Sequence, residues 1–310
     1  MPAFPSRHGL IAATHTPFHA DGSLNLEGIP LQAQGLLELG VTAAFVCGTT
    51  GECSSLTIDE RLAVARRWSE VVQGTELDLI VHVGSNCQQD AVVLAKAAEQ
   101  IGAQGIAALT PCYFKPANEE DLVTFMEPVA AAAPETPFYF YDIPSMTGVA
   151  LSMVRFLDLA GPRIPNLAGL KYTNGDAVQL QECLRFEGGK YDILYGFDES
   201  LLSGLSLGTK GAVGSSYNFA APVYHRVIDA FEQGDLETAR REQADSIRLI
   251  RLLASYGYMA AAKTVMELLG VPVGSPRSPI RGLSVESKKS LEQKLHEQGL
   301  WEKIQPGVKV

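Results

Sequence analysis

The residue in this sequence best suited to covalent chemistry is Lys171, which directly follows the short apolar run Asn-Leu-Ala-Gly-Leu at 166–170. An amine at the end of an apolar strand is expected to point into a water-poor interior. Burial there disfavours the ammonium ion and lowers the pKa from its usual value of about 10.4. A neutral amine is the form that attacks a ketone. The alternative is a surface lysine that keeps its charged end in water, and position alone favours neither interpretation.

A second candidate feature is the loop Cys-Gly-Thr-Thr-Gly-Glu at 47–52. Two glycines flank two hydroxyl residues, and such a loop can turn successive backbone N–H groups toward an anion while Thr49 and Thr50 add hydroxyl donors. The alternative is an ordinary turn between a strand and a helix. We expect Glu52 to brace this loop and not to contact a ligand, and Lys263, which lies beside apolar residues late in the chain, to be structural.

The third candidate is Tyr141, which ends the apolar run Phe138–Tyr141. It precedes Lys171 by one strand–helix repeat, so a phenol and an amine could meet at neighbouring strand ends. A tyrosine there could carry protons during addition to a carbonyl group. The alternative is a core tyrosine whose hydroxyl group bonds to the backbone.

Regularly spaced apolar runs must position these residues. Each run is too short for a helix, and a nearly continuous apolar character predicts parallel strands that are covered on both faces. The eight runs are Leu10–Ala13, Ala43–Val46, Leu79–Val83, Ile106–Leu109, Phe138–Tyr141, Leu167–Leu170, Ile193–Tyr195 and Ala212–Gly214.

Helical patterns separate these runs, at 58–72, 88–101, 119–133 and 177–186. Thr57 and Glu60 form a predicted capping box at the start of the first of them. Eight alternations favour a closed (β/α)8 TIM barrel of the α/β class, in which reactive groups gather at the carboxyl ends of the strands. A doubly wound sheet fits less well, because the first run is followed by Thr-Pro-Phe at 16–18 and not by a glycine-rich turn.

After the eighth run the pattern is purely helical, with helices predicted at 236–256, 259–269 and 285–297. We therefore predict a barrel over residues 1–234 and a C-terminal helical extension over residues 235–310 that packs on the barrel.

Composition excludes several classes of protein. The 310 residues carry a formal net charge of -10, which argues against nucleic acid or an anionic membrane as a partner. No apolar run is long enough to span a bilayer and no signal-type segment begins the sequence, so a cytoplasmic location is expected. Five cysteines without paired spacing predict free thiols and no metal site.

Three motifs at successive strand ends carry a resemblance to a known family. With Gly-Thr-Thr-Gly-Glu at 48–52, Tyr-Asp-Ile-Pro at 141–144 and Gly-Leu-Lys at 169–171, the chain resembles the dihydrodipicolinate synthase and N-acetylneuraminate lyase family of class I pyruvate aldolases. Thr-Pro-Phe at 16–18 and Leu-Thr-Pro-Cys-Tyr at 109–113 are also similar to the family. The resemblance covers roughly the whole barrel and the helical tail.

The resemblance implies a role for each matching residue. Lys171 would form an imine with pyruvate, Tyr141 would relay protons and Thr49 would supply a relay hydroxyl. Thr50 and its neighbouring N–H groups would hold the pyruvate carboxylate. Tyr113 matches a tyrosine that the family places near a neighbouring subunit's active site, which implies a homotetramer. No cofactor or metal is expected, because the protonated imine itself accepts the electrons.

Within the family, Met146 argues against the synthases. These resemble one another in an arginine a few residues after the strand-five tyrosine, which would pair with a second substrate carboxylate. Here the stretch reads Tyr-Asp-Ile-Pro-Ser-Met-Thr-Gly at 141–148, with Met146 at that place.

The ends of the seventh and eighth strands resemble the sialic acid lyases of the family instead. Asp198, Glu199 and Ser215 would hydrogen-bond to the polyhydroxy chain of a sugar acid, and Thr173 and Gly196 match further substrate-contacting positions. The implied activity is the reversible cleavage of N-acetylneuraminate to N-acetylmannosamine and pyruvate, by a carbon–carbon lyase of carbohydrate metabolism. Without the resemblance, Asp198 and Glu199 would be interpreted as an acidic pair at a helix N-terminus.

Three alternatives remain open. The first is an aldolase or dehydratase for another 2-keto-3-deoxy sugar acid, with the same lysine chemistry. The second is a condensation like that of dihydrodipicolinate synthase. The third is a catalytically silent barrel that binds a small keto acid as a sensor.

Overall fold

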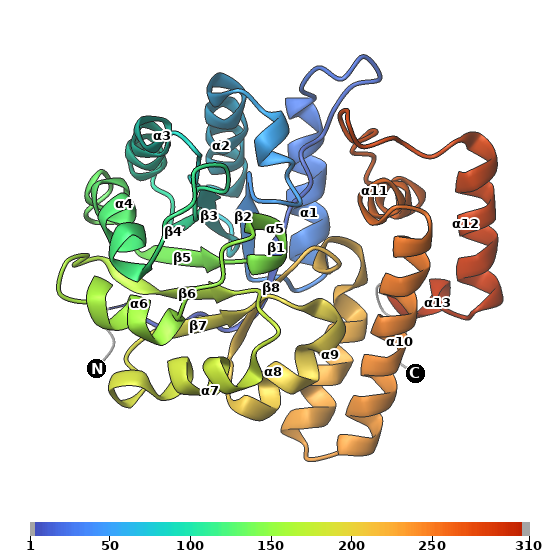
Figure 1. Ribbon diagram of the computed structural model, residues 1–310. Helices are drawn as coiled ribbons and strands as arrows, with labels where there is room; N and C mark the ends of the chain where they lie inside the picture. The colour runs from blue at the N-terminus through green and yellow to red at the C-terminus, as the bar shows by residue number, and fades with distance from the viewer. Residues whose placement is uncertain (1–3, 306–310) are drawn as a thin grey trace.

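Eight parallel strands close into one barrel in the computed structural model, which describes residues 4–305 (Figure 1). Each strand pairs with its sequence neighbour, and β1 pairs with β8 to close the ring. The strands are β1 (Gly9–Ala13), β2 (Ala43–Val46), β3 (Asp78–His82), β4 (Gly105–Leu109), β5 (Phe138–Asp142), β6 (Leu167–Tyr172), β7 (Asp192–Tyr195) and β8 (Gly211–Gly214). The predicted TIM barrel is confirmed, and most strand bounds differ from the predicted runs by one or two residues.

Helices surround the barrel and continue beyond it. The α-helices are α1 (Ile29–Glu38), α2 (Ile58–Val72), α3 (Gln88–Gln100), α4 (Glu119–Ala131), α5 (Pro144–Thr147), α6 (Met153–Ala160), α7 (Ala177–Arg185), α8 (Leu201–Leu207), α9 (Tyr217–Glu232), α10 (Leu236–Ser255), α11 (Tyr258–Leu268), α12 (Val285–Glu297) and α13 (Trp301–Ile304). Short 3-10 helices are η1 (Leu26–Gly28), η2 (Cys53–Ser55), η3 (Phe186–Gly188) and η4 (Asp198–Ser200). The predicted capping box between Thr57 and Glu60 begins α2 as expected. None of the described helices has the length and apolar character needed to cross a bilayer.

Alternating strand residues divide the apolar side chains into two cores. One fills the barrel and includes Ile11, Phe45, Tyr139 and Tyr141. The larger core lies between the strands and the surrounding helices. Strands that are buried on both faces explain why the sequence shows continuous apolar runs.

A bulge in β6 changes which side chains face the barrel interior. Phe138 of β5 lies opposite Leu167, whereas the next residue of β5 lies opposite Gly169, so Ala168 is an extra residue in β6. Strict alternation would put Leu167 and Leu170 on opposite faces, yet both pack in the outer core. The bulge therefore shifts the alternation by one residue and aims Lys171 into the barrel.

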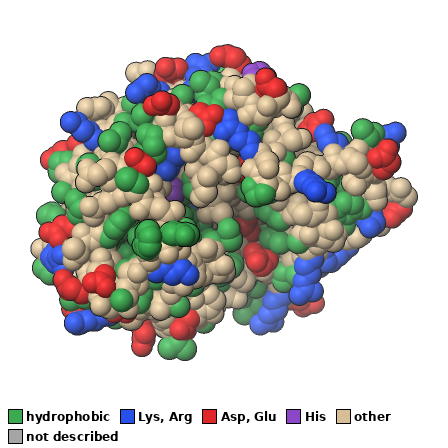
Figure 2. Space-filling view, turned by 45° about the horizontal axis from the view of Figure 1, so that its top comes forward, with side chains coloured by type: hydrophobic (Ala, Val, Ile, Leu, Met, Phe, Trp, Pro, Cys, Tyr) green, Lys and Arg blue, Asp and Glu red, His purple; other side chains and the backbone are tan. Residues whose placement is uncertain are grey.

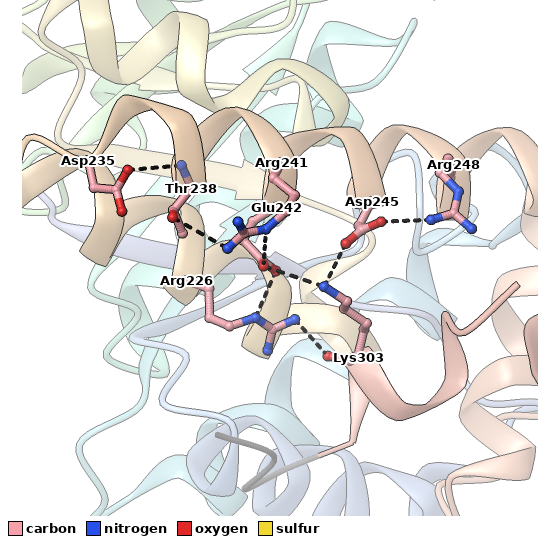
Figure 3. A network of polar contacts seen from close by, with 8 residues as sticks. All are labelled: Arg226, Asp235, Thr238, Arg241, Glu242, Asp245, Arg248 and Lys303. Carbon is pink, nitrogen blue, oxygen red and sulfur yellow. Dashed lines mark hydrogen bonds and ion pairs between the residues drawn. The ribbon is translucent and has the colours of Figure 1, made fainter. Parts of the chain in front are cut away.

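Polar contacts attach the C-terminal helices to the barrel (Figure 3). Glu242 of α10 has a side chain only 3% exposed, and it accepts from Arg226 Nε of α9 at 2.8 Å and Lys303 Nζ of α13 at 3.4 Å. Lys303 also pairs with Asp245 at 2.7 Å. The predicted boundary at 234/235 falls in the turn between α9 and α10. Residues 1–3 and 306–310 of the two predicted domains lie outside the described residues.

The bulge leads to a testable prediction at Gly169. A Cβ atom there would collide with the backbone carbonyl oxygen of Asp192 in β7. We expect Gly169→Ala to lower the free energy of unfolding by about 1–3 kcal/mol or more, because a well-packed backbone must move. Gly175→Ala is the matched control, since a Cβ there meets nothing within 4 Å. Urea unfolding of both variants measures the difference in their free energies of unfolding. Equal values would contradict the close approach of Gly169 to the backbone of β7.

Candidate active site

Lys171 lies inside the barrel and is only 4% exposed. Its Nζ atom is 3.9 Å from the centre of the Tyr141 ring and 4.2 Å from the centre of the Phe45 ring. It is the fifth of six residues in β6, so the strand continues one residue past it to Tyr172. The predicted interior position is confirmed, and the alternative of a surface lysine is wrong.

The surroundings of this amine favour its neutral form. Burial lowers the pKa of Lys171 from 10.5 to about 7, and the nearby Asp198 carboxylate opposes this effect only in part. Near neutral pH a large fraction of the Lys171 side chains therefore carries a free electron pair. This is the protonation state that nucleophilic attack on a carbonyl carbon requires.

Tyr141 lies directly beside the amine, because it is the register partner of Lys171 across β5 and β6. Its hydroxyl oxygen is 3.4 Å from the Thr49 hydroxyl oxygen, and either group can donate. Burial raises the pKa of Tyr141 to about 12, against the smaller opposing effects of the Thr49 and Thr173 hydroxyls. The phenol is therefore protonated at neutral pH and can pass a proton between a substrate and Thr49.

Two aromatic neighbours of this pair were not identified from the sequence. The rings of Phe45 and His82 pack edge-on against Tyr141, each about 6 Å from it between ring centres. Burial first, and then the charges of Arg61 and Lys171, hold the pKa of His82 well below 6.5, so its imidazole is neutral. His82 is the last residue of β3. The same strand-end rule that selected Lys171 could therefore have found it.

The loop after β2 has the glycines that its geometry requires. A Cβ atom at Gly48 would be 2.7 Å from the Phe45 ring, and one at Gly51 would be 3.2 Å from the carbonyl oxygen of Thr14. The Thr16 hydroxyl donates to the Gly51 carbonyl at 2.7 Å. Thr49 and Thr50 are half-buried between these fixed points.

Glu52, at the end of this loop, braces it as predicted. Its carboxylate pairs with Lys263 at 2.7 Å and accepts from the Arg277 backbone N–H at 2.8 Å. Lys263 is likewise buried in a structural contact, as expected from the sequence.

A second group of polar residues lies at the ends of β6, β7 and β8. Thr173 directly follows β6, and Gly196 lies so close to it that a Cβ atom at 196 would collide with the Thr173 hydroxyl oxygen. Ser215 follows β8, and its hydroxyl is 2.7 Å from the Tyr258 hydroxyl at the start of α11.

Asp198 is oriented into the protein. It is 5% exposed, and one of its carboxylate oxygens accepts from the Ser216 N–H at 2.8 Å and the Ser216 hydroxyl at 2.5 Å. Burial raises its pKa to about 6, although the bonds from Ser216 oppose this. Its influence on the pKa of Lys171 shows that it belongs to the same electrostatic environment.

The single chain does not bring every candidate residue to this group. Glu199 is exposed on η4. Tyr113 is 80% exposed, and its ring packs edge-on against Phe114, which is 86% exposed. The part of the chain that the structure describes contains no group of three His, Cys, Asp or Glu residues placed to hold a metal ion. All five cysteines are free, as predicted.

Comparison with known proteins agrees with this arrangement. The model of the dihydrodipicolinate synthetase family matches residues 6–298. N-acetylneuraminate lyase of Danio rerio is 40% identical over 292 residues, which cover 93% of this chain and 95% of the relative. The structure of Proteus mirabilis N-acetylneuraminate lyase is 44% identical with a TM-score of 0.92, over 96% of this chain and 100% of that one. The structure of Aliivibrio salmonicida N-acetylneuraminate lyase (sialic acid aldolase) is 41% identical with a TM-score of 0.93, over 96% and 98%. The chain therefore belongs to the dihydrodipicolinate synthetase family.

Proposed function

We propose that this protein is a carbon–carbon lyase that cleaves N-acetylneuraminate reversibly to N-acetylmannosamine and pyruvate through an imine on Lys171. The observation that carries the proposal is the burial of Lys171, with a pKa of about 7, beside Tyr141 and Thr49. The lyases of Danio rerio and Proteus mirabilis, similar over nearly the full length of this chain, support the choice of substrate.

The proposed reaction begins with attack of the neutral Lys171 amine on the keto carbon of the open-chain sugar acid. Loss of water gives a protonated imine. The bond between the third and fourth carbons then breaks. Its electron pair forms the double bond between the second and third carbons while the C=N pair moves to the nitrogen, and the proton of the fourth-carbon hydroxyl leaves through Tyr141. The products of this step are an enamine and the aldehyde of N-acetylmannosamine. Protonation of the enamine carbon and hydrolysis of the imine release pyruvate and restore the amine.

In this proposal the loop after β2 binds the carboxylate that lies next to the keto carbon. Thr50 and the N–H groups of the loop would hold this carboxylate, while Thr49 would continue the proton path from Tyr141. Fixing the carboxylate orients the keto carbon toward Lys171, and this orientation of the reacting atoms raises the rate of attack. The imine serves as the electron acceptor, so the proposed mechanism uses no cofactor or metal.

The opposite side of the site would recognise the sugar. We assign this role to Thr173, Gly196, Asp198, Glu199 and Ser215, whose polar groups suit a neutral polyol. A second substrate carboxylate, which a dihydrodipicolinate synthase must bind, would be repelled by Asp198 and Glu199. Met146, which is 65% exposed, offers no guanidinium group to pair with it.

We also propose a homotetramer in which Tyr113 contributes to a neighbouring subunit's site. The exposed aromatic pair of Tyr113 and Phe114 supports this, since contact with another subunit would cover it. The proposed partners are small keto acids and sugars. In Figure 2, basic side chains lie among acidic ones over the face that is shown, a distribution unlike the basic surface of a nucleic-acid-binding protein. The cytoplasmic location stays a prediction.

Trapping of the imine tests the proposed reaction directly. Incubation with pyruvate and borohydride should add a stable mass that peptide mapping places on Lys171, and Lys171→Ala should remain folded without labelling or turnover. Because only the neutral amine reacts, the labelling rate should fall about tenfold for each pH unit below 7. An unlabelled Lys171 in the native protein would favour the silent keto-acid-binding barrel.

The relay role of Tyr141 predicts a specific kinetic defect. Tyr141→Phe keeps the ring beside Lys171 but removes the hydroxyl, so imine formation should slow by about 100-fold or more. Tyr139→Phe is the matched control, because Tyr139 also faces the barrel interior but donates to Asp192 at 3.0 Å. Stopped-flow or quenched trapping at saturating pyruvate measures both rates. Equal rates in the two variants would remove Tyr141 from the relay.

Replacement of Asp198 separates sugar recognition from keto-acid recognition. Asp198→Asn should raise KM for N-acetylmannosamine more than KM for pyruvate in the synthetic direction. It should also shift the acid limb of pyruvate trapping to lower pH, since the carboxylate raises the pKa of Lys171. An equal rise in both KM values would contradict the assigned role. In the native protein, fast cleavage of another 2-keto-3-deoxy sugar acid without cleavage of N-acetylneuraminate would favour the alternative aldolase.

A further inference from the structure

Both residues that flank the loop Gly48–Gly51 have a left-handed backbone although neither is glycine. Cys47 has φ 55° and Glu52 has φ 57°, and they are two of the three non-glycine residues with positive φ among residues 4–305. Such a conformation is unfavourable for a residue that has a side chain, and it persists only where surrounding contacts enforce it. The contacts at the two ends therefore determine the shape of the loop.

The first end is held from within the barrel. The Cys47 carbonyl is 2.9 Å from Nδ1 of His82, which donates to it in the neutral imidazole. The buried Arg61 of α2 donates in turn to the carbonyl oxygens of His82 at 2.7 Å and Gly84 at 2.9 Å. These contacts fix the carbonyl that precedes the loop.

The second end is held by the C-terminal extension. Lys263 of α11 pairs with the Glu52 carboxylate at 2.7 Å, and each of these side chains is only 1% exposed. Lys263 Nζ also donates to the Thr16 carbonyl at 3.0 Å, and the Arg277 backbone N–H donates to Glu52 at 2.8 Å. The centre of the Phe18 ring lies 4.4 Å from Lys263 Nζ and 4.4 Å from the guanidinium carbon of Arg277. The closest charged partner of the loop thus comes from more than 200 positions away in the sequence.

We propose that Lys263 is a positioning residue for the carboxylate-binding loop, acting through its buried ion pair with Glu52. The pair keeps the end of the loop in its left-handed backbone, so that the N–H groups of residues 48–51 stay aimed at the substrate carboxylate. Lys263 itself does not touch the substrate. This inference rests on the proposed function, because it assumes that the loop binds the carboxylate of a keto acid.

The two buried lysines therefore have opposite roles. Lys171 lies against aromatic rings, and its burial favours the neutral amine. Burial also lowers the pKa of Lys263, but the carboxylate of Glu52, against which it lies, opposes this effect and favours the ammonium ion. Borohydride trapping should accordingly label Lys171 and leave Lys263 unmodified.

The test replaces Lys263 with methionine, which keeps the length of the side chain but removes its charge. Lys263→Met should raise the pyruvate concentration for half-maximal trapping by about tenfold or more, because displaced donors bind the carboxylate poorly. In the synthetic direction, KM for pyruvate should rise while KM for N-acetylmannosamine stays within about twofold. A loss of folding alone would not separate the two substrates in this way.

Glu242→Gln is the matched control variant. It breaks an ion-pair network of the same extension in which the carboxylate is also buried, but this network joins α10 to α9 and α13 and not to the loop (Figure 3). Both variants should be assayed equally far below their own unfolding midpoints, and Glu242→Gln should leave KM for pyruvate unchanged. If Lys263→Met does not fold, Glu52→Gln, which keeps the shape of Glu52 and removes its charge, should show the same selective rise.

The outcomes distinguish this inference from the proposed function. Failure of the native protein to trap pyruvate on Lys171 would overturn the proposed function and the positioning role together. Normal trapping by the native protein, with Lys263→Met or Glu52→Gln within twofold of it in both KM values, would overturn only the role of Lys263. An equal rise in the two KM values would also overturn it.

Discussion

Removing one amine from water is the constraint on which the site depends. A shift in the pKa of Lys171 from 10.5 to about 7 corresponds to a cost of about 5 kcal/mol for the charged form in the folded protein. This cost is comparable to the whole net stability of many domains, so a large apolar structure must offset it. The closed barrel does so, because it places the amine within an interior that already excludes water.

The barrel strands and the segments that follow them contribute different groups to the site. The strands supply the parts that must be rigid and shielded from water, namely the aromatic rings of Phe45 and Tyr141 that lie against the amine. The segments after the strands supply hydroxyl, amide and carboxylate groups, which need hydrogen bonds and partial access to water. Asp198 combines both environments, since its side chain is buried and one of its carboxylate oxygens accepts two hydrogen bonds from Ser216.

The sequence predicted the fold closely, because strands buried on both faces and amphipathic helices leave strong local patterns. It also predicted Lys171 and Tyr141 as neighbours, since the strand-end rule and the spacing of one repeat suffice for that. The inward orientation of Lys171 could not be derived from strict alternation, because it depends on an extra residue at Ala168 that pairs with nothing. Contacts such as Ser215 with Tyr258, or Glu52 with Lys263, join segments far apart in the chain, and no local pattern reports them.

The bulge also shows that register, and not the number of residues, decides which way the nucleophile faces. Without Ala168, regular alternation from Leu167 onward would still leave Lys171 inside the barrel, because the pairing of the rest of β6 with β5 would not change. A β6 of the present length that lacked the bulge would instead move Lys171 into the outer apolar core beneath the helices. The amine would then be out of reach of any carbonyl compound in the barrel, although every residue of the reacting group remained in the sequence.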